Sequence, residues 1–294
     1  MPKTPIPFAK RFLVPCGKKV SLRHYDPGFK PDDLNKESAQ VQLSKGIEQL
    51  AADQEKLYAQ DRYSLLLVFQ AMDAAGKDGT IKHVMSGINP QGCHVTSFKT
   101  PSAEELDHDY LWRCSKVLPE RGRIGIFNRS YYEEVLIARV HPEILAAQRL
   151  PEPLKKGNIW KQRFEDINNY ESYLSNNGTI ILKFFLHVSK EAQKKRFLER
   201  IDRPEKNWKM SPSDVQERTH WKKYMEAYED IFSNTSSKVA PWYIIPADSK
   251  WVTHLAVCDI ICQKLEGLGL AYPAVTAAHR ESLKKARKIL EDEP

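Results

Sequence analysis

The sequence predicts an α/β fold in which a mostly parallel central sheet carries helices on both of its faces. Three apolar runs, at 65–69, 123–127 and 179–188, each have the length of a buried strand. Segments with helical spacing of apolar residues separate them. Strands that are apolar on both faces and alternate with helices are typical of parallel sheets, whose crossover helices cover both sides. We therefore expect a three-layer α/β/α architecture.

The first half of the chain alternates helix and strand. Apolar residues near helical spacing predict a helix from about residue 34 to residue 60. The strand at 65–69 leads through a glycine-containing turn into a helix at 77–88, and a short strand follows at 93–98. Ser102 and Glu105 have the spacing of a capping box, so another helix is expected to begin there.

The second half continues this alternation. Ser213 and Gln216 have the spacing of a capping box, which predicts a long helix that runs to about residue 232. The apolar run Trp242-Tyr-Ile-Ile245 predicts a last strand. Helical patterns account for most of the remaining segments, at 130–140, 158–175, 189–200, 250–266 and 279–294.

Length and composition indicate one large domain with extensions. A chain of 294 residues with 41% hydrophobic content can bury a full core. Residues 1–32 are rich in Pro, Lys and Arg and predict an extended N-terminal arm. Residues 33–270 form the main domain, and 271–294 predict a charged helical tail.

Other features narrow the class of protein. The five cysteines are scattered and odd in number, which favours reduced thiols over a disulfide framework or a zinc site. The sequence has neither an apolar stretch of membrane-spanning length nor a secretory signal pattern, so we expect a cytoplasmic protein without membrane contact. The net charge of +7 favours an anionic partner.

The segment from Ala71 to Thr80, Ala-Met-Asp-Ala-Ala-Gly-Lys-Asp-Gly-Thr, predicts a phosphate-binding loop. Backbone N–H groups at a helix N-terminus attract anions, and Lys77 would neutralise bound phosphates. The segment departs from the P-loop pattern, because Ala71 replaces a Gly and Asp78 replaces a Ser or Thr. Asp73 would repel phosphates unless a divalent metal lay between, so it is a candidate metal ligand. The alternative is an ordinary strand–turn–helix.

A second polar motif, Asn128-Arg129-Ser130, follows the strand at 123–127. Ligands of open α/β sheets bind at such strand ends. Asn128 is therefore a candidate metal ligand, and Glu133 or Glu134 could supply negative charge one turn later. The alternative for Asn128 is a helix N-cap.

A cluster of basic residues lies in an irregular segment at about 201–220 and in the helices that flank it. This placement favours a lid that closes on phosphates, although a solvated charged face is the alternative. We expect Trp208 and Trp221 to be packing anchors. The cluster consists of Arg196, Arg200, Arg203, Lys206, Lys209 and Arg218.

Four ordered blocks resemble the signatures of the second polyphosphate kinase family. They are 72–79, 125–132, 206–214 and 240–246, and the similarity runs over about residues 30–265. The resemblance implies a P-loop kinase fold related to thymidylate kinase, with a helical lid. It also implies that inorganic polyphosphate donates phosphate to nucleotides with Mg²⁺ or Mn²⁺, in a homo-oligomer such as a dimer or tetramer.

The resemblance also implies roles for individual residues. Asp73, Gly76, Lys77, Asp78 and Gly79 would form the first motif, and Asn128 and Arg129 the second, where many members carry Asp in place of Asn128. Asp73, Lys77, Asn128, Arg129 and Arg200 are the catalytic candidates. Further candidates for phosphate or nucleotide contact are Ala74, Ala75, Thr80, Arg139, Arg203, Lys206, Lys209, Asp214 and Arg218.

The function expected from these motifs is transfer of the terminal phosphate of polyphosphate to AMP and ADP, giving ADP and ATP. Asn128 followed by Ser-Tyr-Tyr-Glu-Glu is similar to the subgroup, often called class III, that phosphorylates both nucleoside mono- and diphosphates. The alternative is an ATP-dependent nucleoside or nucleotide kinase on the same fold. A P-loop switch or nucleic-acid-binding module is a weaker alternative, because neither an Asn-Lys-x-Asp motif nor a basic-aromatic array is present.

Overall fold

A computed structural model, which describes residues 8–155 and 157–293, has a central sheet of five parallel strands in the order β2-β3-β1-β4-β5. Strand β1 lies in the middle, with Leu67 opposite Ile126 of β3 and Leu182 of β4. These side chains are fully buried. The strands are β1 (Ser64–Ala71), β2 (Cys93–Ser97), β3 (Ile124–Asn128), β4 (Thr179–His187) and β5 (Trp242–Pro246).

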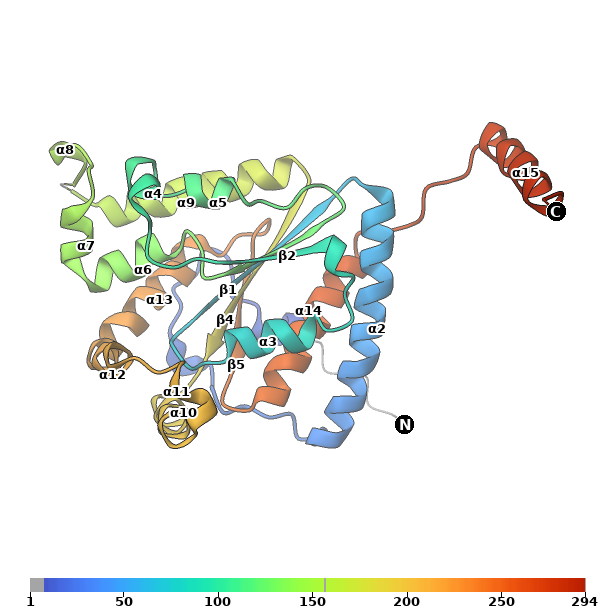
Figure 1. The fold of residues 1–294 in the computed structure, drawn as a ribbon. Coiled ribbons are helices and arrows are strands. Elements are labelled where there is room, and N and C mark those ends of the chain that lie inside the picture. Colours follow the sequence, from blue (N-terminus) through green and yellow to red (C-terminus); the bar gives the residue numbers. More distant parts are fainter. Residues whose placement is uncertain (1–7, 156, 294) are drawn as a thin grey trace.

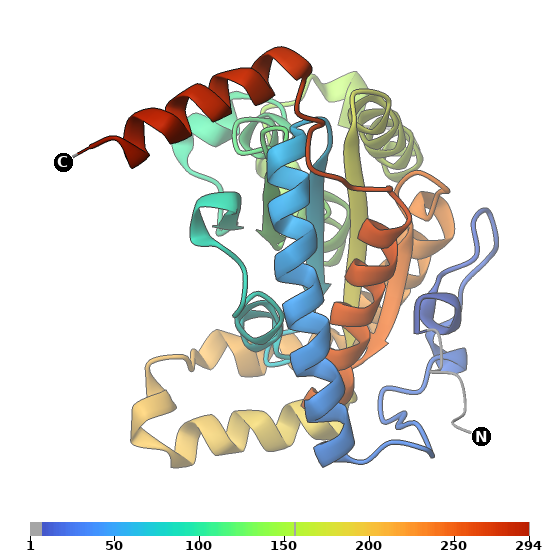
Figure 2. The same cartoon turned by 90° about the vertical axis from the view of Figure 1, so that its right-hand side faces the viewer.

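Helices cover both faces of the sheet, as Figures 1 and 2 show. One layer consists of α2 (Lys36–Gln60), α3 (Lys77–Val84) and α14 (Lys250–Glu266), and the other of α6 (Glu133–Val140), α9 (Ile159–Asn176) and α13 (Trp221–Thr235). The predicted three-layer α/β/α fold is confirmed.

Shorter elements connect these layers. They are α4 (Ala103–Asp107), α5 (Trp112–Ser115), α7 (Pro142–Ala147), α8 (Glu152–Lys155), η2 (Pro90–Gly92) and η3 (Arg218–His220). The capping box predicted at Ser102 and Glu105 is present at the start of α4. A hairpin-like extension of α10 (Lys190–Asp202), α11 (Pro204–Asn207) and α12 (Pro212–Glu217) lies at the end of the sheet where β1 leads into α3.

The long helix predicted from residue 213 to residue 232 is wrong. Ser211, not Ser213, is the N-cap, because its side chain and that of Asp214 form the capping box around Pro212 at the first helical position. The helix α12 then ends at Glu217, and η3 separates it from α13. The chain changes direction at this break, and α13 then packs against α6 and α9 on one face of the sheet.

The N-terminal segment lies along the outer edge of the sheet. It contains α1 (Phe8–Phe12) and η1 (Leu22–His24). The Val14 N–H donates to the Trp242 carbonyl over 2.9 Å, and Leu13 forms an isolated bridge with Tyr243. The arm thus covers β5, which would otherwise be an unpaired edge strand.

The C-terminal segment extends away from this body. All described residues from 271 onward are exposed, including those of α15 (Ala277–Glu291), and Figure 1 shows this helix at a distance from the sheet. None of the helices in the described ranges is long and apolar enough to cross a membrane.

Candidate active site

A cavity of about 640 Å³ lies at the carboxyl ends of β1 and β3, and residues of the α10–α12 extension contribute to its lining. This is the end of an open parallel sheet at which ligands bind. Basic side chains outnumber acidic ones in its lining. The basic residues are Lys77, Lys99, Arg129, Arg196, Arg200, Lys206, Lys209 and Lys250, and the acidic ones are Asp73, Asp78, Glu199 and Asp214.

The loop after β1 has the backbone of an anion-binding turn. Gly76 is the N-cap of α3 with φ of 110°, and Ala74 also lies in the left-handed region with φ of 60°. The first residues of α3 leave N–H groups without partners within the helix, and these are the donors that can bind phosphate. The strained backbone at Ala74 lies beside the cationic cavity and favours the anion-binding interpretation over an ordinary turn.

Two side chains of α10 hold this loop from behind. Arg196 donates to the carbonyl oxygens of Ala74 over 2.9 Å and of Ala75 over 2.7 Å. Gln193 donates to the carbonyl oxygen of Asp73 over 2.8 Å. Because these carbonyls are engaged by α10, they do not compete with the N–H groups for the space in front of the loop.

Lys77 reaches back over its own loop, where its Nζ donates to the Ala71 carbonyl over 3.0 Å. Burial lowers the pKa of this amine, whereas Asp73 acts in the opposite direction. A phosphate in the cavity would add negative charge near Lys77 and favour its protonated form.

The two motifs predicted from the sequence meet at this site. The Asn128 side-chain amide donates to Asp78 over 2.8 Å, and Arg129 pairs with Asp73 over 3.1 Å. The backbone of Arg129 has φ of 66°, a conformation that residues other than Gly rarely adopt. The N-cap alternative for Asn128 is wrong, because α6 begins only at Glu133.

The structure distinguishes between the two glutamates. Burial raises the pKa of Glu133, while Arg129 and Lys77 counteract that shift, so Glu133 lies within the charge network of the loop. Glu134 points elsewhere, since it accepts from Arg163 over 3.2 Å and from Gln148 over 2.7 Å. The structure therefore does not bring Glu134 into the site.

A divalent cation fits the donor set, provided that substrate supplies further oxygen ligands. Among the described residues, no group of three or more His, Cys, Asp or Glu side chains is arranged to hold a metal. Asp73 and Asp78 are nevertheless carboxylates beside the phosphate loop. Mg²⁺ is commonly held by one or two carboxylates together with substrate phosphates and water.

The basic residues of the lid segment divide into two groups. Arg196, Arg200, Lys206 and Lys209 line the cavity, as does Asp214, which lies 4.0 Å from Arg200. Arg203, Arg218 and Arg139 are not among the described lining residues. Arg203 pairs with Glu199 and Glu205, Arg218 donates to the Lys190 carbonyl and to Gln193, and Arg139 pairs with Asp230.

Sequence reasoning missed several lining residues. Lys99 and Lys250 follow the ends of β2 and β5, so the rule that selected Asn128 could have selected them. Trp208 was expected to be a packing anchor, which is wrong, because its side chain is 78% exposed beside Lys209 at the cavity. His83 and His254 stack on each other at 4.5 Å within the lining, and no sequence signal indicated this.

A buried polar network supports the second motif from inside the protein. Lys183 of β4 and Glu171 of α9 form an ion pair over 2.6 Å, and both side chains are 0% exposed. Glu171 also accepts from the hydroxyl groups of Tyr131 and Tyr132, which directly follow the Asn128-Arg129-Ser130 motif. The network thus holds the segment that directly follows Arg129 in one position.

A parallel sheet with a phosphate loop, a cationic cavity and carboxylates suited to a metal defines a phosphoryl-transfer enzyme. Comparisons with known proteins identify the family. The family model described as polyphosphate kinase 2 matches residues 33–269. The chain therefore belongs to the polyphosphate kinase 2 family and is a kinase, and the resemblance predicted from four sequence blocks is confirmed.

Individual relatives match nearly the whole chain. An ADP-polyphosphate phosphotransferase from Rhodopseudomonas palustris is 52% identical over 96% of this chain and 98% of the relative. An AMP/ADP-polyphosphate phosphotransferase from Meiothermus ruber is 41% identical over 90% of this chain and 95% of the relative. The crystal structure of polyphosphate kinase 2 from Arthrobacter aurescens superimposes with a TM-score of 0.85 and 38% identity, over 95% of this chain and 97% of that one.

Proposed function

We propose that this kinase transfers the terminal phosphate of inorganic polyphosphate to AMP and to ADP, giving ADP and ATP. The observation that carries the proposal is that the phosphate loop and the second motif meet in one cavity whose charged side chains are mainly basic. A linear polyanion suits such a lining, because cations on several sides can hold consecutive phosphates. The names of the Rhodopseudomonas and Meiothermus relatives support polyphosphate as donor.

In the proposed reaction, a phosphate oxygen of the acceptor forms a bond to the terminal phosphorus of the donor. The bond from that phosphorus to the bridging oxygen breaks, and the donor leaves one phosphate shorter. The acceptor oxygen is already anionic, so no strong general base is required. Lys77 and Arg129 would neutralise charge on the transferred group, and the N–H groups after Gly76 would hold it in line.

We propose that Asp73 and Asp78 hold Mg²⁺ or Mn²⁺ together with donor oxygens, with Asn128 as a neutral neighbour. When bound, the cation would neutralise phosphate charge and orient the donor. The negative charge of Glu133 would offset part of the positive charge of Arg129 and Lys77. In the loop, Ala74, Ala75, Asp78, Gly79 and Thr80 would shape the donor site, and Arg200, Lys206 and Lys209 would close over it.

Acceptor choice is tested by supplying AMP and, separately, ADP with polyphosphate and Mg²⁺, and by resolving all nucleotides by chromatography. Formation of both ADP and ATP from AMP would support the dual-acceptor proposal. Activity on ADP alone would restrict the acceptor, as the name of the Rhodopseudomonas relative does for that protein. Transfer from ATP but not from polyphosphate would refute the proposed donor and favour an ATP-dependent nucleotide kinase.

The expectation of a homo-oligomer stays a prediction, as does a cytoplasmic location. A dimer or tetramer would elute at the corresponding mass in size-exclusion chromatography with light scattering. The N-terminal arm packs along β5 of its own chain, so an unchanged mass after removal of residues 1–7 alone would exclude only that short segment as the contact.

A further inference from the structure

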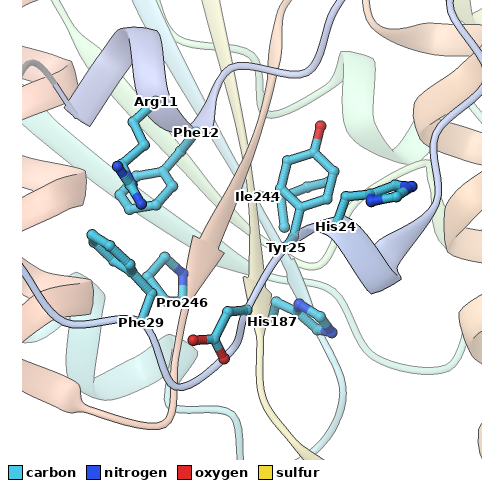
Figure 3. A pocket seen from close by; sticks show the side chains of 9 residues that line it. Arg11, Phe12, His24, Tyr25, Phe29, His187, Ile244 and Pro246 are labelled. Carbon is cyan, nitrogen blue, oxygen red and sulfur yellow. The ribbon is translucent and has the colours of Figure 1, made fainter.

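A second cavity, of about 250 Å³, lies under the N-terminal arm at the ends of β4 and β5 (Figure 3). The arm contributes Phe12, Tyr25 and Phe29, and the sheet contributes His187 and Ile244. Within residues 8–155 and 157–293, this cavity shares no lining residue with the active-site cavity. It therefore needs an explanation separate from phosphoryl transfer.

Aromatic side chains and the Arg11 guanidinium line one side of this cavity. The rings of Phe12 and Phe29 meet edge to face, with centroids 5.7 Å apart. The guanidinium carbon of Arg11 lies 3.9 Å from the centroid of the Phe29 ring. Aromatic rings and guanidinium planes stack well on planar ligands, because their faces are apolar and polarisable.

The other side carries an imidazole of which one nitrogen lacks a partner among the described residues. His187 lines the cavity with only 8% of its surface exposed. Its Nδ1 is buried and, within the described part of the chain, has no hydrogen-bond partner. Burial lowers the pKa of this imidazole, so the neutral form, with one donor and one acceptor nitrogen, is favoured. Buried polar atoms are normally paired, so this orphan nitrogen points to a missing partner.

Charge and size select the class of ligand. Arg11 and Asp26 are of opposite sign, so the part of the lining that the structure describes has no excess of basic side chains like that of the active-site cavity. An uncharged ligand is therefore favoured over a nucleotide. The volume of about 250 Å³ lies below the roughly 300–1,000 Å³ of typical drug-sized sites. Planarity, neutrality and small size together fit a free nucleobase or a nucleoside.

A short chain of hydrogen bonds connects this cavity to the phosphate loop. The carbonyl of His187 accepts from the Ala247 N–H over 2.9 Å. The carbonyl of Ala247 accepts from Arg196 over 2.6 Å, and Arg196 also holds the carbonyl of Ala75 in the loop. The arm is connected to the residue after Ala247, because the Asp248 N–H donates to the Pro27 carbonyl over 3.0 Å. A ligand that contacts the arm and His187 would thereby act on the loop through Arg196.

We propose that this cavity is a second binding site, specific for an uncharged base or nucleoside, and that its occupancy alters the affinity of the phosphate loop for polyphosphate. The site is distinct from the acceptor site of the proposed reaction. Binding can be measured without turnover, so its failure and the failure of the proposed kinase reaction are distinguishable.

The experiment titrates adenosine, guanosine, cytidine, uridine and adenine into the full chain by calorimetry. The titrations are repeated at rising concentrations of ADP alone, without donor. We expect at least one compound to bind, and its apparent Kd to reach a plateau as ADP saturates the active site. An apparent Kd that rises without limit would mean competition at the acceptor site and would overturn the proposal. Absence of binding by every compound would overturn it as well.

Variants locate the binding. Phe29→Leu and Arg11→Ala should each weaken binding by about two- to tenfold, whereas Lys10→Ala, an exposed neighbour on α1, should not. All three should keep kinase activity in the absence of nucleoside. A saturating nucleoside should change the Kd for polyphosphate in the absence of acceptor, and polyphosphate should change the nucleoside Kd by the same factor. Equal binding by all variants would overturn the assignment, and an unchanged Kd for polyphosphate would overturn the link to the loop.

Discussion

The buried Lys183–Glu171 pair makes a strong prediction for stability. Lys183→Met removes an amine that donates to Glu171 over 2.6 Å, to the Tyr132 hydroxyl over 2.8 Å and to the Thr235 carbonyl over 2.8 Å. The substitution leaves the Glu171 carboxylate buried with only two tyrosine hydroxyls as partners. Loss of one member of such a pair costs about 3–5 kcal/mol of unfolding free energy. Urea unfolding followed by circular dichroism measures this as a lower midpoint.

A second substitution tests whether the uncompensated charge is the cause. Lys183→Met combined with Glu171→Gln removes both charges and keeps an acceptor for Tyr131 and Tyr132. The three hydrogen bonds that Lys183 donates would still be lost, at about 1 kcal/mol each, so we expect a cost of about 3 kcal/mol, at the lower end of the range for the single variant. Lys195→Met, an exposed lysine on α10, should change stability by no more than about 0.5 kcal/mol. A single variant that loses under about 1 kcal/mol, or a double variant less stable than the single one, would refute the reasoning.

The remaining predictions concern the active site. Lys77→Ala should lower kcat by about two to three orders of magnitude at unchanged thermal stability, and near-normal turnover would contradict its place in the loop. Asn128→Asp should change metal dependence or the AMP-to-ADP preference, and an identical profile would leave Asn128 with only its contact to Asp78. KM for polyphosphate should rise with ionic strength if cations hold the donor, and a flat profile would argue against this. Burial, together with His83 and Lys250, lowers the pKa of His254 from 6.5 to about 4. The unfolded chain therefore binds a proton that the folded one does not, and stability should fall as pH drops from 6.5 to 4. His254→Gln should remove up to about 3 kcal/mol of that loss in acid unfolding curves.

The sequence predicts elements well where a single periodicity decides the structure. The strands of the sheet and the helix at Lys250–Glu266 lie where apolar runs and helical spacing placed them. The helix predicted from residue 213 failed because two overlapping serine patterns competed, and Pro212 favoured the earlier one. A local pattern identifies residues that can cap a helix, but it does not show which of two neighbouring candidates is the N-cap.

Site residues were predictable when they lay within a motif and hard to predict when they acted from another element. The contacts between Asn128 and Asp78 and between Arg129 and Asp73 join the two predicted motifs. Arg196 was visible only as one charge in a basic cluster, because its role depends on α10 lying behind the loop. Glu133 and Glu134 are equivalent in the sequence, and only the direction of each side chain from α6 separates them.

The left-handed backbone at Arg129 has a consequence for protein engineering. A glycine there would adopt φ of 66° without steric conflict, which stabilises the local backbone by about 1–2 kcal/mol. The same change would remove the guanidinium that pairs with Asp73. A screen for heat resistance alone would therefore favour Arg129→Gly, although the change removes a group that we propose contacts the transferred phosphate. Thermostable forms of this kinase should be selected with turnover as a second criterion.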